Sequence, residues 1–289
     1  MIQLVASPWE GYELLATGDG KRLERFGQHT IVRPDPNVIW PIAKPISQAW
    51  SRPDAVFTNG KDGWQASERL AAGWSLPYNR LRFIVRPTPF RHVGLFPEQS
   101  AHWEWLEQSI RRAKSTQPVR VLNLFGYTGA ASVVAAAAGA TVCHVDASRG
   151  MVQWGKENAA ASGLSDTAIR WIVEDALKFM RREVRRGNKY DIILMDPPVF
   201  GRGPKGEIWR LEEQLSELIQ VTGQLLSDTP RGLLLNWYAT ALYPESVVRL
   251  MDQHLGARFP KQEWGSLVLQ ESDGKNVLGT GFFYRSSFL

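Results

Sequence analysis

Cysteine is nearly absent from this 289-residue sequence, in which Cys143 is the only one. A single cysteine cannot form an intrachain disulfide or a thiolate metal cage. The five histidines show no metal-ligand spacing, so we expect no bound metal. The first ten residues have no basic segment followed by an apolar run, which argues against a signal peptide. No apolar run is long enough to span a membrane, so we predict a cytoplasmic protein without a membrane partner.

The net charge of the chain excludes few classes of partner. The formal net charge is +5 and 44% of the residues are hydrophobic, so a full core is available. A mildly basic balance is compatible with a nucleic-acid partner but does not diagnose one.

The segment from residue 119 to 146 is the most informative part of the chain. Val119–Leu124 is a short apolar run, typical of a strand buried on both faces, and Phe125–Gly129 is a tight turn. Ser132–Ala138 is small and favours a helix, and Thr141–Val145 is a second strand-like run that Asp146 follows. This strand–turn–helix–strand pattern predicts a nucleoside-binding crevice at the carboxyl ends of parallel strands.

The turn itself discriminates between nucleoside ligands. Dinucleotide folds use Gly-x-Gly-x-x-Gly, whose middle glycine admits a pyrophosphate. Here Thr128 carries a Cβ at that position, between Gly126 and Gly129. A nucleoside without a phosphate, such as S-adenosyl-L-methionine, fits better, with the two glycines beside its methionyl part. Asp146 would accept hydrogen bonds from the ribose hydroxyls.

A second acidic site follows the next predicted strand, Ile169–Val173. In Glu174-Asp175-Ala176, an acid could accept from the adenine amine while a backbone N–H meets a ring nitrogen. Asp175 could equally cap the following helix, and both roles are compatible.

A third site follows the predicted strand Asp191–Met195. Asp196 precedes Pro197 and Pro198, and the two prolines hold the backbone extended. This arrangement aims the Asp196 carboxylate and the Pro197 carbonyl into the crevice, where they could hold an amine that loses a proton.

The loop from residue 200 to 206 is rich in glycine and basic residues. Phe200 could stack on a base, while Arg202 and Lys205 could hold phosphates. A mobile surface loop is the competing interpretation.

Two domains are predicted. Residues 1–89 contain short strand-like runs separated by turn signals, which indicates a small β-rich domain. Residues 90–289 alternate strands with helices, including a helix over Glu207–Leu226, and end in two strands joined without a helix. The fold class is therefore α/β, a Rossmann-like, seven-stranded, mostly parallel sheet with an antiparallel edge hairpin.

These motifs resemble those of a known family. Asn-Leu-Phe-Gly-Tyr-Thr-Gly, His-Val-Asp-Ala-Ser and Asp-Pro-Pro-x-Phe are similar to those of class I S-adenosylmethionine-dependent methyltransferases, specifically the bacterial large-subunit rRNA methyltransferases of the RlmI/RlmK type. The resemblance runs from about Phe90 to the C-terminus. It departs from the family at Val199, where lysine is common, and no counterpart of the family's PUA RNA-binding domain is expected.

The resemblance implies an enzyme (EC 2.1.1.-) that methylates rRNA or its precursor, with S-adenosyl-L-methionine as cofactor and no metal. It implies a cofactor site that includes residues outside the motifs above. The implied cofactor residues are His92, Gln99, Phe125, Gly126, Tyr127, Thr128, Gly129, Asp146, Ala147, Ser148, Glu174, Asp175 and Ala176. The implied catalytic residues are Asp196, Pro197 and Pro198, and the substrate-binding residues are Phe200, Arg202 and Lys205.

The methylated atom is predicted from the lack of a second cysteine. Methylation at C5 of a pyrimidine needs a thiolate that adds to C6, and the stretch after the fifth predicted strand, Leu235-Asn236-Trp237-Tyr238-Ala239, has none. Cys143 lies within a strand and should be buried and inert, so we predict N-methylation. A methyltransferase for a small molecule or protein side chain, and a non-catalytic S-adenosylmethionine- or RNA-binding protein, stay open. A nicotinamide oxidoreductase fits poorly because of Thr128.

Overall fold

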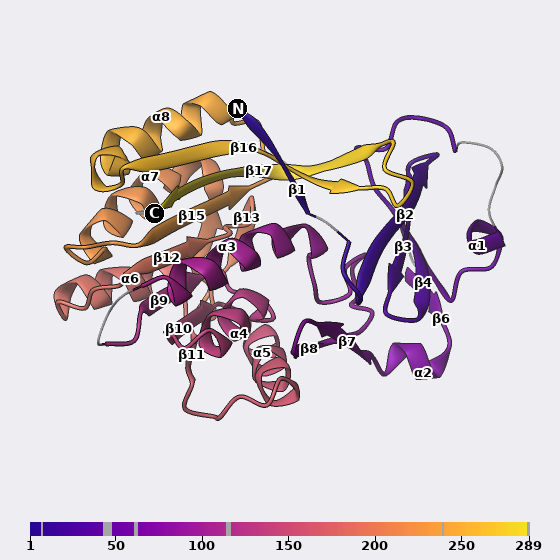
Figure 1. Ribbon diagram of the computed structural model, residues 1–289, viewed down its shortest axis with the longest axis horizontal. Helices are drawn as coiled ribbons and strands as arrows, with labels where there is room; N and C mark the ends of the chain where they lie inside the picture. The colour runs from indigo at the N-terminus through magenta and orange to yellow at the C-terminus, as the bar shows by residue number, and fades with distance from the viewer. Residues whose placement is uncertain (7, 43–47, 61–62, 114–116, 239, 288–289) are drawn as a thin grey trace. The chain divides into compact units, whose positions relative to one another are not determined.

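The computed structural model describes residues 1–6, 8–42, 48–60, 63–113, 117–238 and 240–287 (Figure 1). The chain forms two compact units. Unit 1 comprises Met1–Leu4, His102–Leu267 and Gly281–Leu289, and unit 2 comprises Val5–Ala101 and Val268–Thr280. A functional division between residues 89 and 90 stays a prediction.

Unit 2 is rich in strands, as predicted. Its larger sheet has the order β2-β3-β4-β5-β6, and β7 and β8 form a separate antiparallel pair. The strands are β2 (Tyr12–Gly18), β3 (Lys21–Phe26), β4 (His29–Pro34), β5 (Ala55–Thr58), β6 (Gly63–Ala66), β7 (Trp74–Tyr78) and β8 (Leu81–Val85). Its short helices are α1 (Gln48–Ser51), α2 (Glu68–Ala71) and the 3-10 turn η1 (Pro97–Gln99). β7 was not predicted, because Pro77 interrupts its apolar pattern.

Unit 1 is built on an eight-stranded sheet with the order β1-β16-β17-β15-β12-β9-β10-β11. The strands are β1 (Ile2–Ala6), β9 (Arg120–Leu124), β10 (Thr141–Asp146), β11 (Ile169–Val173), β12 (Ile192–Met195), β15 (Gly232–Trp237), β16 (Lys261–Gln270) and β17 (Val277–Ser287). Strands β15, β12, β9, β10 and β11 run parallel, and β17 is antiparallel to β15. All seven expected strands are present, and β1 adds an eighth beyond β16.

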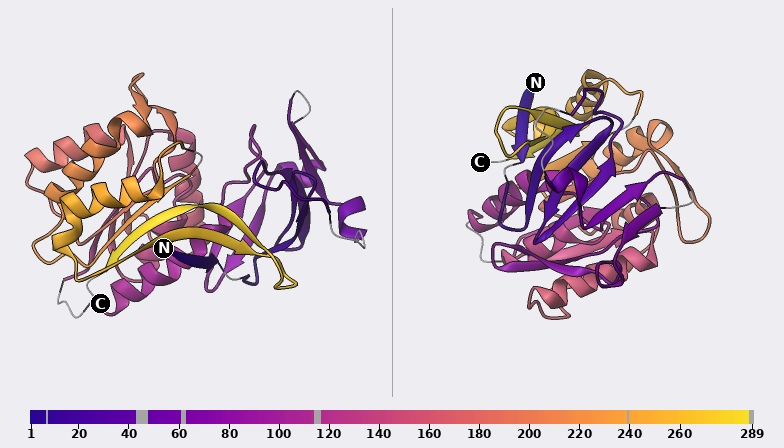
Figure 2. Two further views of the ribbon diagram at one scale, coloured as in Figure 1. Left: turned by 90° about the horizontal axis from the view of Figure 1, so that it is seen from above. Right: turned by 90° about the vertical axis from the view of Figure 1, so that its right-hand side faces the viewer.

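Helices cover both faces of this sheet, as alternation of strands and helices requires (Figures 1 and 2). The helices are α3 (Ser100–Arg111), α4 (Ala130–Ala137), α5 (Arg149–Ala161), α6 (Ala176–Arg185), α7 (Leu211–Leu225), α8 (Pro244–Leu255) and the 3-10 turn η2 (Gly256–Arg258). Helices α6, α7 and α8 pack on alternate strand residues such as Leu124, Met195 and Leu235 to form the main core. No helix in the described part of the chain is long and apolar enough to cross a membrane.

One local prediction was wrong. The segment expected to be a loop followed by a helix from Glu207 is a hairpin, β13 (Phe200–Arg202) and β14 (Ile208–Arg210), and α7 begins at Leu211. In this hairpin Trp209 pairs with Gly201 and is 2% exposed, whereas Ile208 and Arg210 on either side of it are exposed, an alternation that fits a strand. Figure 2 shows this hairpin projecting at the edge of unit 1, in orange.

Candidate active site

The strand register brings the predicted residues to one edge of the sheet in unit 1. Leu124 of β9 lies level with Val145 of β10 and with Met195 of β12, and Asp146 lies level with Val173 of β11. The residues that follow these positions therefore emerge together at the carboxyl ends of four adjacent parallel strands, where open α/β sheets bind their ligands.

The turn after β9 has an unusual backbone. Phe125, Tyr127 and Gly129 all have positive φ, at 55°, 51° and 77°. The left-handed conformation costs roughly 1–2 kcal/mol for a residue that carries a Cβ, so two such residues in one turn indicate stored strain. Strain of this kind persists only where the surrounding structure enforces it, and it is concentrated at functional sites.

Asp146 is one of the groups that enforce this turn. Its Oδ2 accepts the backbone N–H of Tyr127 at 2.8 Å, and its Oδ1 accepts that of Ser148, also at 2.8 Å. Burial raises the pKa of Asp146, and the two N–H donors act in the opposite direction. A carboxylate offers about four lone-pair positions, so Asp146 can accept further hydrogen bonds. Its contact with ribose hydroxyls stays a prediction. Ser148 also caps α5 by accepting a hydrogen bond from Met151 N. Ala147 lies between Asp146 and Ser148 in the sequence.

A buried polar network beneath the turn was not predicted. Asn123 Nδ2 of β9 donates to Ser132 Oγ of α4 at 2.9 Å, and Ser132 Oγ lies 3.0 Å from His144 Nδ1 of β10. All three side chains are buried, and Asn123 and His144 are level in adjacent strands. Burial, partly opposed by a hydrogen bond to the backbone of Tyr127, lowers the pKa of His144 to about 3. His144 is therefore a neutral support for the turn at ordinary pH.

The two turn glycines are explained by packing beneath the turn. A Cβ on Gly126 would lie 2.4 Å from the His144 ring, and one on Gly129 would lie 3.1 Å from the Trp171 ring. The rings of His144 and Trp171 are in turn 4.6 Å apart between centroids. The turn thus rests directly on two aromatic rings, whereas its closeness to a methionyl group stays a prediction. Thr128 is buried, and its carbonyl accepts from Asn158 of α5.

The acids after β11 have partners of their own. Asp175 caps α6, with Oδ1 accepting from Lys178 N at 2.9 Å, so the predicted capping role is confirmed. Glu174 forms an ion pair with Arg182. Ala176 is the buried first residue of α6. Contact of this segment with adenine stays a prediction.

The Asp-Pro-Pro motif is connected to the turn after β9 through the hairpin. Trp209 Nε1 donates to the Pro198 carbonyl at 2.6 Å, and the Trp209 and Phe125 rings lie 4.8 Å apart. Pro197 is buried, and Asp196 follows the strand residue that lies level with Leu124. One indole thus fixes the position of Asp-Pro-Pro relative to the turn. Sequence alone did not single out Trp209, which looked like one of many core tryptophans.

The predicted substrate residues lie on the hairpin. Phe200 is 53% exposed, Arg202 is exposed beside it, and Lys205 is exposed at the tip. His92 and Gln99 lie in unit 2, where burial and nearby arginines lower the pKa of His92 to about 3. Their contact with a cofactor stays a prediction.

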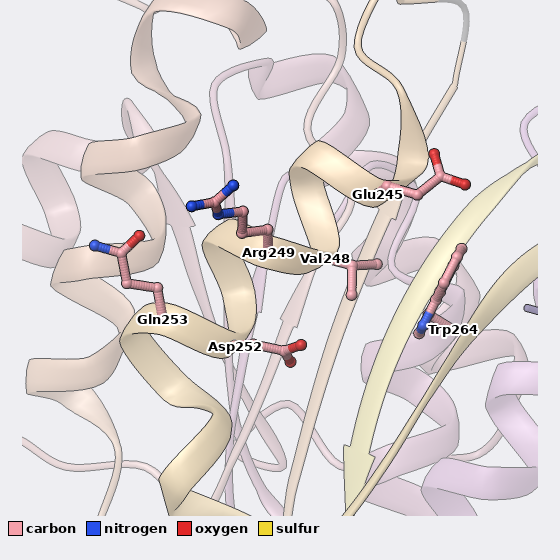
Figure 3. A pocket seen from close by; sticks show the side chains of 6 residues that line it. All are labelled: Glu245, Val248, Arg249, Asp252, Gln253 and Trp264. Atoms are coloured by element: carbon pink, nitrogen blue, oxygen red, sulfur yellow. The ribbon is translucent and has the colours of Figure 1, made fainter.

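A separate hollow of about 640 Å³ lies on α8 and β16 (Figure 3). Glu245, Val248, Arg249, Asp252, Gln253 and Trp264 line it, and none of the predicted site residues is among them. Asp252 accepts from Tyr284 OH at 2.7 Å. In the described residues no group of three or more His, Cys, Asp or Glu side chains is arranged to hold a metal ion.

Comparison with known proteins identifies the family. A sequence profile of the S-adenosylmethionine-dependent methyltransferase family matches residues 45–233, more than half of the chain. The chain belongs to this family. The crystal structure of an S-adenosylmethionine-dependent methyltransferase from Agrobacterium tumefaciens is 41% identical, with a TM-score of 0.93, over 100% of this chain and 94% of that one. A structure from Streptococcus mutans, 18% identical with a TM-score of 0.70 over 97% of this chain and 76% of that one, supports the fold alone.

Curated relatives are rRNA methyltransferases. Ribosomal RNA large subunit methyltransferase I of Aeromonas hydrophila is 32% identical over 50% of this chain and 36% of its own length. Ribosomal RNA large subunit methyltransferase K/L of Shewanella frigidimarina is 38% identical over 53% of this chain and 20% of its own length. The chain therefore spans at most a little over a third of the length of these relatives.

The methyltransferase's cofactor is S-adenosylmethionine, and the site agrees with it. Asp146 is oriented by two backbone N–H groups and retains acceptor positions for a ribose. The turn carries Thr128 in place of the glycine that a pyrophosphate needs, and that residue is buried. These features suit a nucleoside without a diphosphate.

Proposed function

We propose that this methyltransferase transfers a methyl group to a nitrogen of an RNA base, with rRNA or its precursor as substrate. The observation that carries the proposal is the position of Asp196-Pro197-Pro198, directly after β12 and beside the strained turn after β9. The names of the curated relatives support an rRNA substrate, and a cytoplasmic location follows from that substrate as part of the same proposal.

In this proposal each part of the motif has a separate role. Trp209 binds the Pro198 carbonyl. We assign the Asp196 carboxylate and the Pro197 carbonyl to receive hydrogens from a target amine. When bound, S-adenosylmethionine supplies an electrophilic methyl group on a sulfonium. The residues of the chain orient the nitrogen lone pair, accept its proton at Asp196 and exclude water, which is sufficient for displacement at a methyl group.

The state of Cys143 favours nitrogen over C5 of a pyrimidine. Cys143 is 5% exposed, and burial raises the pKa of its thiol to about 11. Its side chain packs in the core with Met180 and Tyr190, as predicted for a structural cysteine. The thiolate that C5 chemistry requires is therefore not available from this residue.

The test is incubation with labelled S-adenosylmethionine and separate RNA, protein and metabolite fractions, followed by nucleoside mass spectrometry. We expect label in rRNA as an N-methylated nucleoside. Label confined to the protein or metabolite fraction would instead support the alternative substrate class.

A further inference from the structure

The β13–β14 hairpin has two faces of opposite character. Phe200 pairs with Arg210, Gly201 with Trp209 and Arg202 with Ile208. Because side chains alternate along a strand and paired residues share a face, Trp209 and Gly201 form the inner face. The outer face consists of Phe200, Arg202, Ile208 and Arg210, and all four residues are exposed.

Apolar and cationic side chains alternate across this outer face. Phe200 and Ile208 are 53% and 52% exposed and lie on one diagonal, and the two arginines lie on the other. Directly paired residues have Cβ atoms about 5 Å apart, and same-face neighbours along a strand are about 7 Å apart. Each arginine is therefore within reach of a large apolar side chain.

The charges of the outer face are available to a ligand. Arg202 makes no ion pair with any residue that the structure describes. Arg210 lies 3.6 Å from Glu213, in a pair whose side chains are 58% and 67% exposed. A pair this exposed contributes little and can be exchanged for a phosphate. Arg182 of α6 differs, because it pairs with Glu174 and the two side chains are only 29% and 16% exposed.

We propose that the outer face of the β13–β14 hairpin, formed by Phe200, Arg202, Ile208 and Arg210, docks single-stranded RNA that flanks the target base. This proposal rests on the proposed function. The two arginines hold phosphates, and Phe200 and Ile208 contact unstacked bases. An enzyme that modifies a base acts on it outside the duplex, so the adjoining strand needs a surface of this kind.

The inner face of the hairpin explains how such docking would serve catalysis. Trp209 binds the Pro198 carbonyl and lies against Phe125, while Leu211 N donates to the Val199 carbonyl at 3.0 Å. The docking face is thereby fixed with respect to Asp-Pro-Pro. RNA held on the outer face would be positioned relative to Asp196 by a rigid connection of a few residues.

The test is the salt dependence of binding to a fluorescein-labelled, mixed-sequence, single-stranded RNA 12-mer, measured by anisotropy. For the Arg202→Ala/Arg210→Ala double variant we expect about 10-fold weaker binding. Each phosphate contact on a single strand contributes about 0.7 to the slope of log K against log salt, so the slope should fall by about 1.4. Arg111→Ala is the matched control, since Arg111 is similarly exposed and pairs with Glu107 on α3.

Phe200→Ala separates stacking from charge. It should weaken binding by roughly 5- to 100-fold, the range expected for a lost base–aromatic contact, with the salt slope unchanged. Affinity for S-adenosylmethionine should be unchanged in all these variants. Wild-type affinity and slope in the double variant would overturn the docking proposal, as would tight binding of the same sequence as duplex. If the wild-type protein neither binds nor methylates RNA, the proposed function itself fails.

Discussion

The two sides of the candidate active site are built on different principles. On the side of β9 and β10, polar side chains are buried and bonded to one another, as in the Asn123–Ser132–His144 network beneath the turn. On the side of β12, the hairpin exposes Phe200 and Arg202 to solvent. A buried, internally hydrogen-bonded support suits a small ligand of fixed shape, whereas an exposed face with cations suits a larger, flexible, charged one.

This difference predicts distinct responses to mutation. Changes on the turn side should alter cofactor affinity and stability, and changes on the hairpin side should alter RNA affinity and its salt dependence. Asp196 follows β12 directly, and its replacement should lower the rate of the chemical step and leave both affinities close to wild type.

The largest effect is expected for Asp196→Ala. Loss of the group that orients the target nitrogen and accepts its proton should lower kcat by roughly 10²- to 10⁴-fold. Steady-state kinetics together with calorimetric titration of S-adenosylmethionine provide the measurement, and cofactor affinity should be retained. Asp196→Asn keeps an acceptor oxygen but cannot act as a base, so its kcat should lie between those of the wild type and Asp196→Ala. Near-wild-type kcat in Asp196→Ala would remove Asp196 from the mechanism.

Asp146→Ala should act on the cofactor instead. It removes the acceptor for the N–H groups of Tyr127 and Ser148 and the acceptor that we expect for the ribose hydroxyls. The change should cost roughly 1–3 kcal/mol of cofactor affinity. Titration with S-adenosylmethionine and with NAD measures this, and the wild-type protein should bind only the former. An unchanged affinity would mean that the ribose site lies elsewhere.

Gly126→Ala tests the support beneath the turn. The added Cβ would lie 2.4 Å from the His144 ring, and overpacking of this kind costs about 1–3 kcal/mol. Thermal unfolding should show the loss, and cofactor affinity should fall with it. Adding His144→Ser should restore part of the stability by making room. The control is Gly150→Ala, where the nearest atom to a new Cβ is 3.8 Å away.

Acid should weaken the same support. The pKa of His144 is about 3 in the folded protein and about 6.5 in the unfolded chain. Between about pH 3 and pH 6.5, therefore, His144 is protonated in the unfolded chain and neutral in the folded protein. The stability contributed by the neutral ring is complete above about pH 6.5 and is lost as the pH falls, on the order of 1–2 kcal/mol by pH 5. Thermal unfolding at pH 7 and pH 5 should therefore show a smaller decline in His144→Gln than in wild type. The exposed His254→Gln is the control, and equal declines in all three proteins would exclude His144.

Sequence predicted the parts of this site that depend on local pattern. Buried strands, the glycine turn and acids at strand ends all follow from residue type and spacing, so the positions of Asp146 and Asp196 at the ends of β10 and β12 were predicted correctly. The network and the hairpin depend on contacts between distant segments. Asn123 and His144 did carry a signal, since each is a polar residue within a buried strand. Ile208-Trp209-Arg210 was not recognised as a strand, and the contacts of Trp209 with Pro198 and Phe125 join segments that lie apart in the sequence.

The smallest effect is expected for Cys143→Ser. Unchanged activity in this variant would support N-methylation, which needs no cysteine. The thiol is buried on β10, and burial raises its pKa to about 11. It is therefore neither accessible nor ionised at neutral pH. If nitrogen is methylated, the folded variant should retain wild-type kcat with a modest loss of stability, because a hydroxyl is less suited to an apolar site. Cys143→Ala avoids the buried hydroxyl and should also retain wild-type kcat. Comparing the two variants separates an effect on folding from an effect on catalysis. 5-Methylcytidine in the digested product would contradict N-methylation. Abolished activity in both folded variants would implicate this cysteine as the nucleophile.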